Sequence, residues 1–292
     1  MLQSEAISNQ VRLALSEDIG TGDLTASLIP SDKYLNAQVI VREDIVVCGI
    51  PWFDESFRQL SPSVRINWHV SEGQQASADQ VLCVLSGDAR ALLTGERTAL
   101  NFLQMLSAVA THTCKFVEVV KDTGTQIVDT RKTLPGLRLA QKYAVRCGGG
   151  VNHRTGLYDG ILIKENHIIA AGNIEAALRK AAEISSSDVF IQIEVETQDE
   201  LRQALAAGAR MVLLDNFDLS ALQEAVAFNR QFLNGPAILE ASGNVTLNTV
   251  RAIAETGVDR ISIGSLTKDI QAVDLSMRFY ETVRLSDMPG TN

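Results

Sequence analysis

The 292-residue sequence has few cysteines, few prolines and few aromatic residues, and it contains no long uninterrupted run of apolar residues. Its four cysteines are scattered without a CxxC pair, which excludes a zinc knuckle or a CxxC redox motif. No stretch approaches the roughly 18 consecutive apolar residues that span a bilayer. The N-terminal residues lack a basic region followed by an apolar one, so we expect no secretory signal, and a cytoplasmic protein with reduced thiols.

Positive charge is also scarce, since 26 lysines and arginines stand against 35 aspartates and glutamates and give a formal net charge of −9. Nucleic acids and anionic membranes attract proteins with dense positive charge, so we expect neither as a partner. Hydrophobic residues make up 46% of the chain, which is enough for a substantial core. The length fits two domains or one large α/β barrel.

The first 110 residues predict a half-exposed antiparallel sheet. Apolar and polar residues alternate there in three short runs, at 37–42, 65–70 and 81–85. Residues 96–120 then contain neither proline nor glycine, and their apolar residues recur at helical spacing: Leu100, Leu103, Leu106 and Val109. We therefore predict a long, largely buried helix that links this part to the rest of the chain.

After residue 120 the pattern changes to alternating strands and helices. Six short apolar runs are typical of buried parallel strands: 126–128, 160–163, 190–195, 211–214, 237–239 and 260–263. Amphipathic segments between most of them predict four helices, at 174–182, 198–207, 219–229 and 247–255. Gly208 and Gly257 follow two of these helices, where a C-cap glycine is expected. Such repeats build either a doubly wound sheet or an α/β barrel.

Polar or small residues follow each of these six strands: Asp129, Arg131, Lys132, Lys164, Glu194, Glu196, Asp215, Asn216, Glu240, Ser242, Gly264 and Ser265. In a barrel all of these strand ends meet at one mouth, where barrel enzymes place their chemistry. A doubly wound sheet would bring together mainly the residues beside its switch point, and its usual glycine-rich nucleotide motifs are absent from the sequence. We therefore favour an irregular barrel over a doubly wound sheet.

A basic segment lies within this acidic chain at residues 131–164. It holds seven basic residues and one acidic residue, so its net charge is +6 and the remainder of the chain carries −15. Three of the basic residues fall at helical spacing and fit a solvated helix face: Arg138, Lys142 and Arg146. The other four follow strand ends or the glycine run 148–150: Arg131, Lys132, Arg154 and Lys164.

We expect those four residues and His153 to form an anion-binding cavity. Guanidinium groups match carboxylates through a planar fork, and lysines act as movable point charges for phosphate. The alternative is that the charges form structural ion pairs with three acidic neighbours: Asp129, Asp159 and Glu165.

Two carboxylates, Glu194 and Asp215, follow neighbouring strands on the other side of the expected mouth. Basic and acidic groups that face each other suit an anionic substrate with a developing cation, or Mg²⁺ that bridges phosphate oxygens. The alternative is that both carboxylates only pair with the basic side chains opposite. Glu196 could also replace Glu194, because the two lie on the same face of one strand.

Small residues follow two late strands: Ser242, Gly243, Asn244, Gly264 and Ser265. Small residues at a strand-to-helix turn expose backbone N–H groups to an anion, and the late strands are the usual place for phosphate in barrels. We therefore predict phosphate-binding turns at both positions.

Several strings of the sequence resemble one enzyme family, the quinolinate phosphoribosyltransferases. They are DIGTGDLT (18–25), ERTALNFLQ (96–104), DTRKTLPGLR (129–138), GGGVNHRTGLYDGILIKENH (148–167), IEVET (193–197), LLDNF (213–217) and LEASGNV (239–245). The resemblance covers residues 18–267, and Asn244 stands where the family pattern often has a second glycine. It implies an N-terminal open α/β sandwich at 1–110, with the tail 272–292 packed back on it. It further implies an about seven-stranded α/β barrel of the type II phosphoribosyltransferase kind at 111–271.

The same resemblance implies a homodimer that transfers phosphoribosyl from phosphoribosyl pyrophosphate to quinolinate. The products are nicotinate mononucleotide, CO₂ and pyrophosphate, made for NAD biosynthesis with Mg²⁺ and without an organic cofactor. It assigns quinolinate to Arg131, His153, Arg154, Lys164 and, from the partner subunit, Arg97. It assigns phosphate groups to Lys132, Ser242, Gly243, Asn244, Gly264 and Ser265. Catalytic roles fall to Lys132, Lys164, Glu194 and Asp215, of which the two carboxylates would hold Mg²⁺ through substrate or water.

Two other functions stay open on the sequence alone. A lysine that ends a barrel strand, as Lys164 does, is also how Schiff-base aldolases are built. A phosphosugar-binding protein without catalytic activity could likewise keep the cavity, although the intact pair of Glu194 and Asp215 argues against it.

Overall fold

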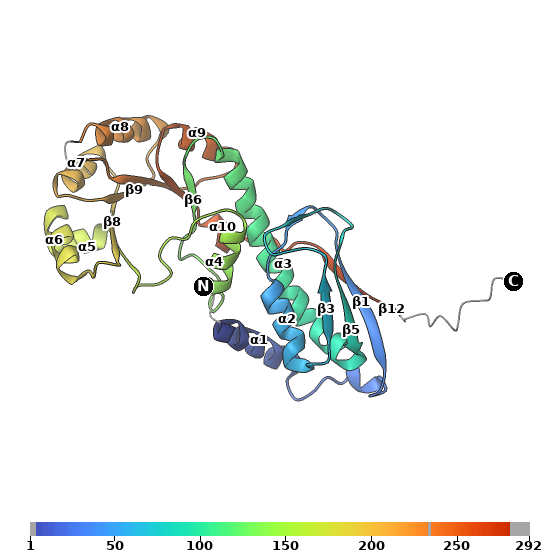
Figure 1. Ribbon diagram of the computed structural model, residues 1–292. Helices are drawn as coiled ribbons and strands as arrows, with labels where there is room; N and C mark the ends of the chain where they lie inside the picture. The colour runs from blue at the N-terminus through green and yellow to red at the C-terminus, as the bar shows by residue number, and fades with distance from the viewer. Residues whose placement is uncertain (1–3, 233–234, 281–292) are drawn as a thin grey trace. The chain divides into compact units, whose positions relative to one another are not determined.

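The computed structural model describes residues 4–232 and 235–280 (Figure 1). Contacts divide the chain into two compact units. Unit 1 consists of the described parts of Met1–Thr111, Leu139–Cys147 and Ile270–Asn292. Unit 2 consists of His112–Arg138 and the described parts of Gly148–Asp269. Residues Leu139–Cys147 therefore belong to unit 1, whereas the domain ranges expected from the sequence placed them in the barrel.

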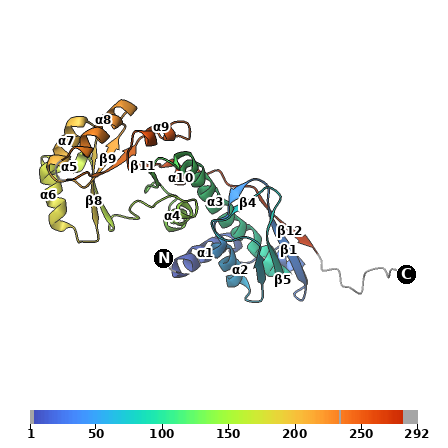
Figure 2. The same ribbon diagram turned by 45° about the horizontal axis from the view of Figure 1, so that its top comes forward.

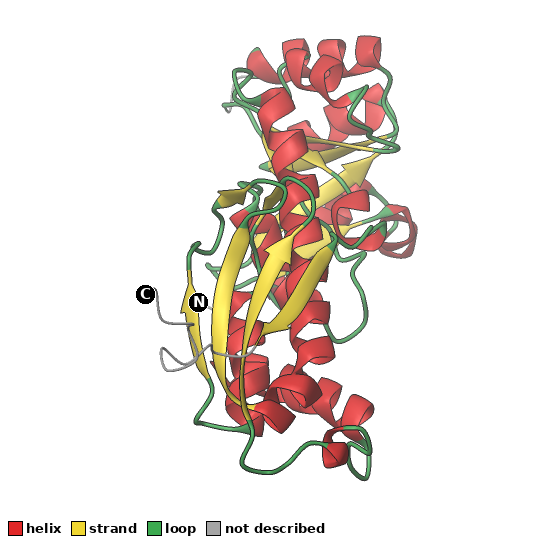
Figure 3. Ribbon diagram, turned by 90° about the vertical axis from the view of Figure 1, so that its right-hand side faces the viewer, coloured by secondary structure: helices red, strands yellow, loops and turns green. Residues whose placement is uncertain are grey.

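The main sheet of unit 1 is antiparallel and has the strand order β12-β1-β5-β3 (Figure 3). Its strands are β1 (Tyr34–Val41), β3 (Arg65–Trp68), β5 (Val81–Asp88) and β12 (Leu275–Tyr280). A small second sheet pairs β2 (Ile45–Val46) with β4 (Gln75–Ala76). Because β12 pairs along β1, the described end of the chain is part of this sheet, and the rest of the expected tail, 281–292, lies outside the described residues.

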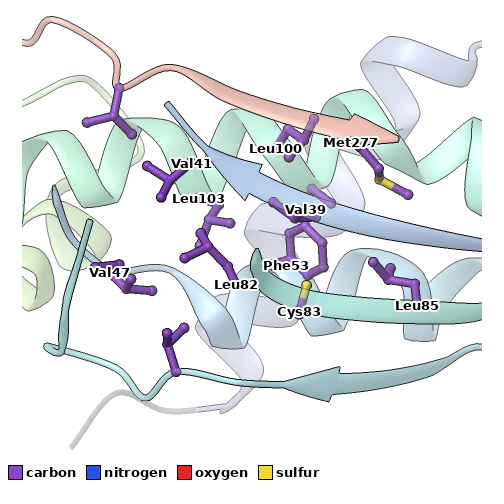
Figure 4. Packing of buried hydrophobic residues seen from close by; sticks show 14 of the residues in the cluster. Val39, Val41, Val47, Phe53, Leu82, Cys83, Leu85, Leu100, Leu103 and Met277 are labelled. Atoms are coloured by element: carbon purple, nitrogen blue, oxygen red, sulfur yellow. The ribbon is translucent and has the colours of Figure 1, made fainter. Parts of the chain in front are cut away.

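Helix α2 (Ile50–Leu60) and the first part of α3 (Ala89–Val120) pack against this sheet and enclose the core of unit 1. Helix α1 (Ser4–Ile19) packs on α2, Tyr143 of α4 (Arg138–Cys147) contacts Trp52 of α2, and a short 3-10 helix lies at Ala26–Leu28. Figure 4 shows strand residues such as Val39 and Leu82 facing Phe53 of α2 and Leu103 of α3. Gly95 permits this packing, because a Cβ there would lie 2.8 Å from the Phe57 ring.

Unit 2 contains a parallel sheet with the strand order β6-β11-β10-β9-β8-β7. Its strands are β6 (Gln126–Val128), β7 (Gly160–Ile163), β8 (Phe190–Val195), β9 (Met211–Asp215), β10 (Ile238–Ser242) and β11 (Arg260–Ser262). A parallel bridge between Val128 and Val151 adds a seventh position beside β6. From β7 to β11 each strand lies beside the next, which is the order of a barrel and excludes the doubly wound alternative. The expected irregular α/β barrel is confirmed.

Helices α6, α7 and α8 lie on the outer side of the curved sheet, as Figures 1 and 2 show. The helices from β7 to the end of unit 2 are α5 (Glu165–Ala171), α6 (Ile174–Ile184), α7 (Gln198–Ala206), α8 (Leu219–Arg230), α9 (Val250–Glu255) and α10 (Ser265–Lys268). Thr197 and Glu200 form a capping box at the start of α7, and Gly208 follows its end with a φ of 85°. Within the described residues no helix combines the length and the apolar character needed to cross a membrane.

Candidate active site

The carboxyl ends of the unit 2 strands surround a cavity of about 200 Å³. It is lined by Asp129, Thr130, Arg131, Lys132, His153, Arg154, Leu162, Lys164, Glu194, Leu213, Glu240, Ser242 and Ser262. The structure therefore brings together all of the separated basic residues expected at the mouth. Since the strands are parallel, their ends deliver these side chains to one place although they are far apart in sequence.

The two arginines of this cavity, Arg131 and Arg154, present donors that are not all satisfied by protein groups. Arg154 donates from Nη1 to the Gly160 carbonyl at 3.1 Å. Burial, and then the neighbouring Arg131 charge, lower the pKa of the Arg154 guanidinium. Arg131 Nε is buried without a hydrogen-bond partner among the described residues. Two like charges and a buried free donor disfavour an empty site and favour one that holds an anion.

Lys164 and Glu194 form an ion pair between neighbouring strand ends at the mouth. Lys164 directly follows β7, Glu194 lies on the adjacent β8, and their Nζ and Oε2 atoms are 2.7 Å apart. Half of the lysine side chain remains exposed. The ion pairing considered for this carboxylate is therefore present, and it holds Lys164 where its ammonium can turn toward an anionic ligand. Glu196 is exposed and lines neither cavity, and its backbone N–H donates to the carboxylate of Glu200 in the first turn of α7.

Asp129 and Asp159 organise the loop that carries His153 and Arg154. Asp129 is fully buried, and it accepts hydrogen bonds from the backbone N–H of His153 at 2.8 Å and from Asn152 Nδ2 at 2.6 Å. Asp159 accepts the backbone N–H groups of the two residues after Arg154. Burial raises the pKa of Asp159, but these hydrogen bonds outweigh burial and bring the pKa below its usual value. Both carboxylates thus fix loop backbone.

A hydrogen-bonded series of buried side chains adjoins the cavity: His153 and Glu240 line it, and Gln192 lies between them. The backbone N–H of Arg154 donates to His153 Nδ1 at 2.7 Å, so the imidazole carries its proton on Nε2. That nitrogen lies 2.6 Å from Gln192 Oε1, and Gln192 Nε2 donates to Glu240 Oε2 at 3.2 Å. Gln192 and Glu240 have no exposed surface. The series fixes the tautomer of His153 and supports the Arg154 backbone.

Buried polar atoms at the cavity remain open to hydrogen bonds from a ligand. Glu240 Oε1 has no hydrogen-bond partner within the described part of the chain, although it lies 3.9 Å from His153 Nε2. The cavity is thus lined by a free buried acceptor as well as the free donor of Arg131. Sequence reasoning did not single out Gln192 or assign a role to Glu240. The signal was present, because Gln192 shares the inward face of β8 with Glu194 two residues later.

A second cavity of about 970 Å³ adjoins the first, and Thr130, Lys132, Ser242 and Ser262 line both. It is also lined by Asp215, Asn216, Gly243, Asn244, Gly264, Ser265, Lys268 and, from α3, His112. All of the residues expected to bind phosphate are therefore at this place. Gly264 makes room for a basic group, because a Cβ there would lie 3.0 Å from Lys132 Cδ.

The predicted carboxylates line different cavities. Glu194 lines the smaller one, and Asp215 lines the larger one, where Asn216 Nδ2 donates to Asp215 Oδ2 at 2.9 Å. Arg97, which the resemblance assigned to the quinolinate site of a partner subunit, is an exposed residue of α3 in unit 1 and lines neither cavity.

Comparison with known proteins relates both units to one family. The family model of the quinolinate phosphoribosyl transferase N-terminal domain matches residues 23–107, and that of the C-terminal domain matches residues 109–278. The chain is 42% identical over 263 residues to the probable nicotinate-nucleotide pyrophosphorylase [carboxylating] of Bacillus subtilis, with 89% of each chain covered. It is 38% identical to quinolinate phosphoribosyltransferase [decarboxylating] 2 of Nicotiana glauca, with 92% of this chain and 80% of the relative covered.

A solved structure agrees with these sequence relatives. The nicotinate-nucleotide pyrophosphorylase from Francisella tularensis superposes with a TM-score of 0.91 at 46% identity. The match covers 96% of this chain and 98% of the other.

Proposed function

The chain belongs to the quinolinate phosphoribosyltransferase family, and we propose that the two cavities at its barrel mouth are where it carries out that family's reaction. The enzyme is a decarboxylating phosphoribosyltransferase of NAD biosynthesis that uses quinolinate and phosphoribosyl pyrophosphate. The observation that carries the placement is the smaller cavity, where Arg131 keeps a buried free donor beside Arg154 and Lys164.

Quinolinate fits the smaller cavity because it carries two carboxylates on adjacent carbons of a flat ring. Arg131 and Arg154 can each offer a carboxylate two parallel N–H donors, and Lys164 can add a point charge. His153, whose Nδ1 accepts the backbone N–H of Arg154, contributes by fixing the Arg154 backbone and one wall of the cavity. Phosphoribosyl pyrophosphate would place its 5′-phosphate against Ser242–Asn244 and Gly264–Ser265 in the larger cavity. Lys132, which lines both cavities, would meet the pyrophosphate.

The reaction then needs charge stabilisation more than covalent catalysis. The bond from the ribose C1 to the pyrophosphate oxygen breaks, and its electron pair leaves with pyrophosphate, which Lys132 and Lys164 stabilise. The ribose becomes cationic, and the carboxylates of Glu194 and Asp215 stabilise that charge. The ring nitrogen of quinolinate bonds to C1 and becomes a pyridinium. The adjacent carboxylate leaves as CO₂, and the ring carbon that keeps the electron pair takes up a proton.

Magnesium fits the residues present as an ion held partly by the substrate. Carboxylate oxygens and waters are the ligands that Mg²⁺ prefers, and Glu194 and Asp215 supply carboxylates. Glu194 is already paired with Lys164, and the two acids line adjoining cavities, so phosphate oxygens and water would complete the ligand set. The ion would neutralise phosphate charge, and no organic cofactor is needed.

Arg97 and the free cysteines bear on assembly and location. The guanidinium of Arg97 is exposed on α3, which suits a role in the site of a partner subunit within a homodimer. Four free cysteines suit the reducing cytoplasm as the place of action.

The test is an assay of ¹⁴CO₂ release from carboxyl-labelled quinolinate with and without phosphoribosyl pyrophosphate and Mg²⁺. We expect release only when all three are present, and loss of more than about a hundredfold in kcat/KM for Arg131→Ala, because a buried charged contact is removed. Arg202→Ala is the matched control, since Arg202 lies on α7 with a half-exposed side chain. Equal rates with nicotinate would contradict the quinolinate assignment. Reductive trapping of Lys164 by borohydride with a keto substrate would support the aldolase alternative.

A further inference from the structure

In unit 1, two thiols and a carboxylate that the mechanism does not use come together. The ligating atoms of Cys48, Glu72 and Cys147 lie within 4.8 Å of one another. Cys48 precedes Gly49, the N-cap of α2, and Cys147 is the last residue of α4. Ninety-eight residues of chain separate the two cysteines.

The contacts give the carboxylate and the thiols different roles. Glu72 caps α2: its two carboxylate oxygens accept the backbone N–H groups of Gly49 at 2.7 Å and Ile50 at 3.1 Å. The Cys48 thiol is hydrogen-bonded to both Glu72 and Cys147, and the Tyr143 hydroxyl is bonded to Cys147. Because Glu72 is held by the helix end, the pair of facing thiols is the reactive part of the cluster.

The two thiols are unequal. Cys48 has no exposed surface, and burial raises its pKa. Cys147 is partly exposed, and the hydrogen bond from Cys48, which outweighs the opposing effects of burial and Glu72, lowers its pKa. A thiol of a partly exposed residue that ionises more readily beside a buried thiol is the arrangement of an attacking and a resolving cysteine.

We propose that Cys48 and Cys147 are a modification site, at which a peroxide converts the two thiols into an intramolecular disulfide. The geometry carries this inference, since the two sulfur atoms lie within 4.8 Å of each other in hydrogen-bonding contact, and a disulfide joins them at about 2.0 Å. The proposal is independent of the catalytic assignment above.

The chemistry balances in two steps with hydrogen peroxide as the oxidant. The Cys147 thiolate attacks one peroxide oxygen, the O–O bond breaks, and the products are a sulfenic acid and hydroxide. The Cys48 sulfur then attacks the sulfenic sulfur, the S–O bond breaks, and water leaves with the Cys48 proton, which Glu72 is placed to accept and pass on. Two electrons leave the thiols, and one peroxide becomes two waters.

A metal site is the competing interpretation of the same cluster. Zn²⁺ prefers thiolate and imidazole ligands and usually takes four protein ligands in a structural site. Among the described residues this cluster offers two sulfurs and one carboxylate, and that carboxylate is already bonded to two backbone N–H groups. The thiol pair therefore favours the disulfide.

The test treats the reduced, full-length protein with submillimolar hydrogen peroxide, quenches it with acid, and maps free thiols by alkylation and peptide mass spectrometry. We expect loss of two of the four thiols and a linked peptide pair containing Cys48 and Cys147, lighter by two hydrogens and restored by dithiothreitol. Cys48→Ser is expected to stop at a sulfenic acid on Cys147 that dimedone captures. Cys114→Ser, which removes a partly exposed cysteine outside the cluster, is the matched control and should form the disulfide as the parent does.

Several results would overturn the proposal. One is a linked pair that contains Cys83 or Cys114, and another is a parent in which Cys48 and Cys147 stay alkylatable while Cys114 oxidises. A stoichiometric zinc ion in the purified parent, lost in Cys48→Ser, would establish the metal site instead. The parent measurement alone decides the matter if a variant fails to fold.

Discussion

Gly243 and Asn244 both have positive φ angles, 114° and 47°, in the turn after β10 that lines the larger cavity. Residues other than glycine avoid this region, and asparagine is among the few that enter it readily. The positive φ at position 244 therefore suits asparagine.

Gly243→Ala is expected to damage phosphate binding specifically. A Cβ at Gly243 would overlap Asn216 Oδ1 and lie 3.0 Å from Asn216 Cγ, so the turn and the neighbour of Asp215 must shift. We expect the KM for phosphoribosyl pyrophosphate to rise about tenfold, as strain of about 1–3 kcal/mol is relieved by moving the turn. Gly172→Ala is the matched control, because its φ is 98° but open space surrounds it. Steady-state kinetics that show equal KM changes in both variants would refute the argument.

Asp159→Asn is expected to destabilise the protein in a pH-dependent way. The Asp159 carboxylate accepts the N–H groups of Thr155 and Gly156, and its pKa lies below the ordinary 3.8. A lowered folded-state pKa contributes stability that is complete above the ordinary value and is lost as pH falls through the folded value. The variant should therefore unfold at lower urea concentration than the parent at pH 7, and the gap should narrow below about pH 4.

The control for this pH effect is Asp199→Asn on α7. Its side chain is 83% exposed, and its ion pair with Arg202 is of the surface kind that contributes little. The difference in unfolding urea concentration between the parent and Asp159→Asn could instead stay constant from pH 7 to pH 3, or equal that of the control. Either result would show that the charge of Asp159 is not the cause of the lost stability.

At the scale of elements, the hydrogen bonds among His153, Gln192 and Glu240 join strands that are separate in sequence. Gln192 on β8 is hydrogen-bonded to Glu240 on β10 and to His153, which lies two residues after Val151, the residue that bridges to β6. Gln192→Leu removes both of its hydrogen bonds and leaves Glu240 Oε2 without this donor. We expect the free energy of unfolding to fall by about 2 kcal/mol, because a buried acceptor loses its partner. The KM for quinolinate should rise as His153 and Arg154 lose their support.

Glu240→Gln separates the two effects in this network. It keeps the size of the side chain and an amide that can bond Gln192, so the loss of stability in urea titrations should be smaller than for Gln192→Leu. If Gln192→Leu matches the parent in both stability and KM for quinolinate, the hydrogen bonds of Gln192 to His153 and Glu240 do not position the site.

The elements that sequence patterns located are those with a clear period and clear ends. All six predicted parallel strands are present, because buried strands such as 211–214 are continuous apolar runs. The helix predicted at 96–120 is part of α3, which begins earlier at Ala89. The pairing of Ile45–Val46 with Gln75–Ala76 was not predicted, because two residues show no alternation. Helix α9 begins at Val250, later than expected, because hydrogen bonds between Thr246 and Thr249 hold a turn there.

The candidate site shows the same division between local pattern and long-range contact. Residues such as Lys132 and Ser242 were predictable because strand ends in a barrel converge. The Lys164–Glu194 pair was foreseen only as an alternative, since sequence does not say which charges will meet. Gln192 was missed because a polar residue inside an apolar run gives no hint of its partner, which is 48 residues further along the chain.

For the whole molecule, the two units are not two consecutive stretches of the chain, as the sequence suggests, because each is built from separate segments. Helix residues Leu139–Cys147 belong to unit 1, although the residues on both sides belong to unit 2. The alternation of strands and helices gives no sign of this, because one helix looks like any other in such a series. What decides is packing, as in the contact of Tyr143 with Trp52 at 5.6 Å between ring centroids.

A homodimer whose active sites are shared between subunits has a testable consequence for variants of Arg97 and Arg131. If Arg97 completes the site of a partner subunit, Arg97→Ala and Arg131→Ala should each lose nearly all activity as homodimers. A refolded equimolar mixture should recover about a quarter of the parent's activity, because half of the dimers are mixed and each mixed dimer has one intact site. Turnover measured against the fraction of mixed dimer, with two differently tagged variants, checks this. A mixture as inactive as its components, or full activity of Arg97→Ala alone, would show that each subunit works with its own residues only.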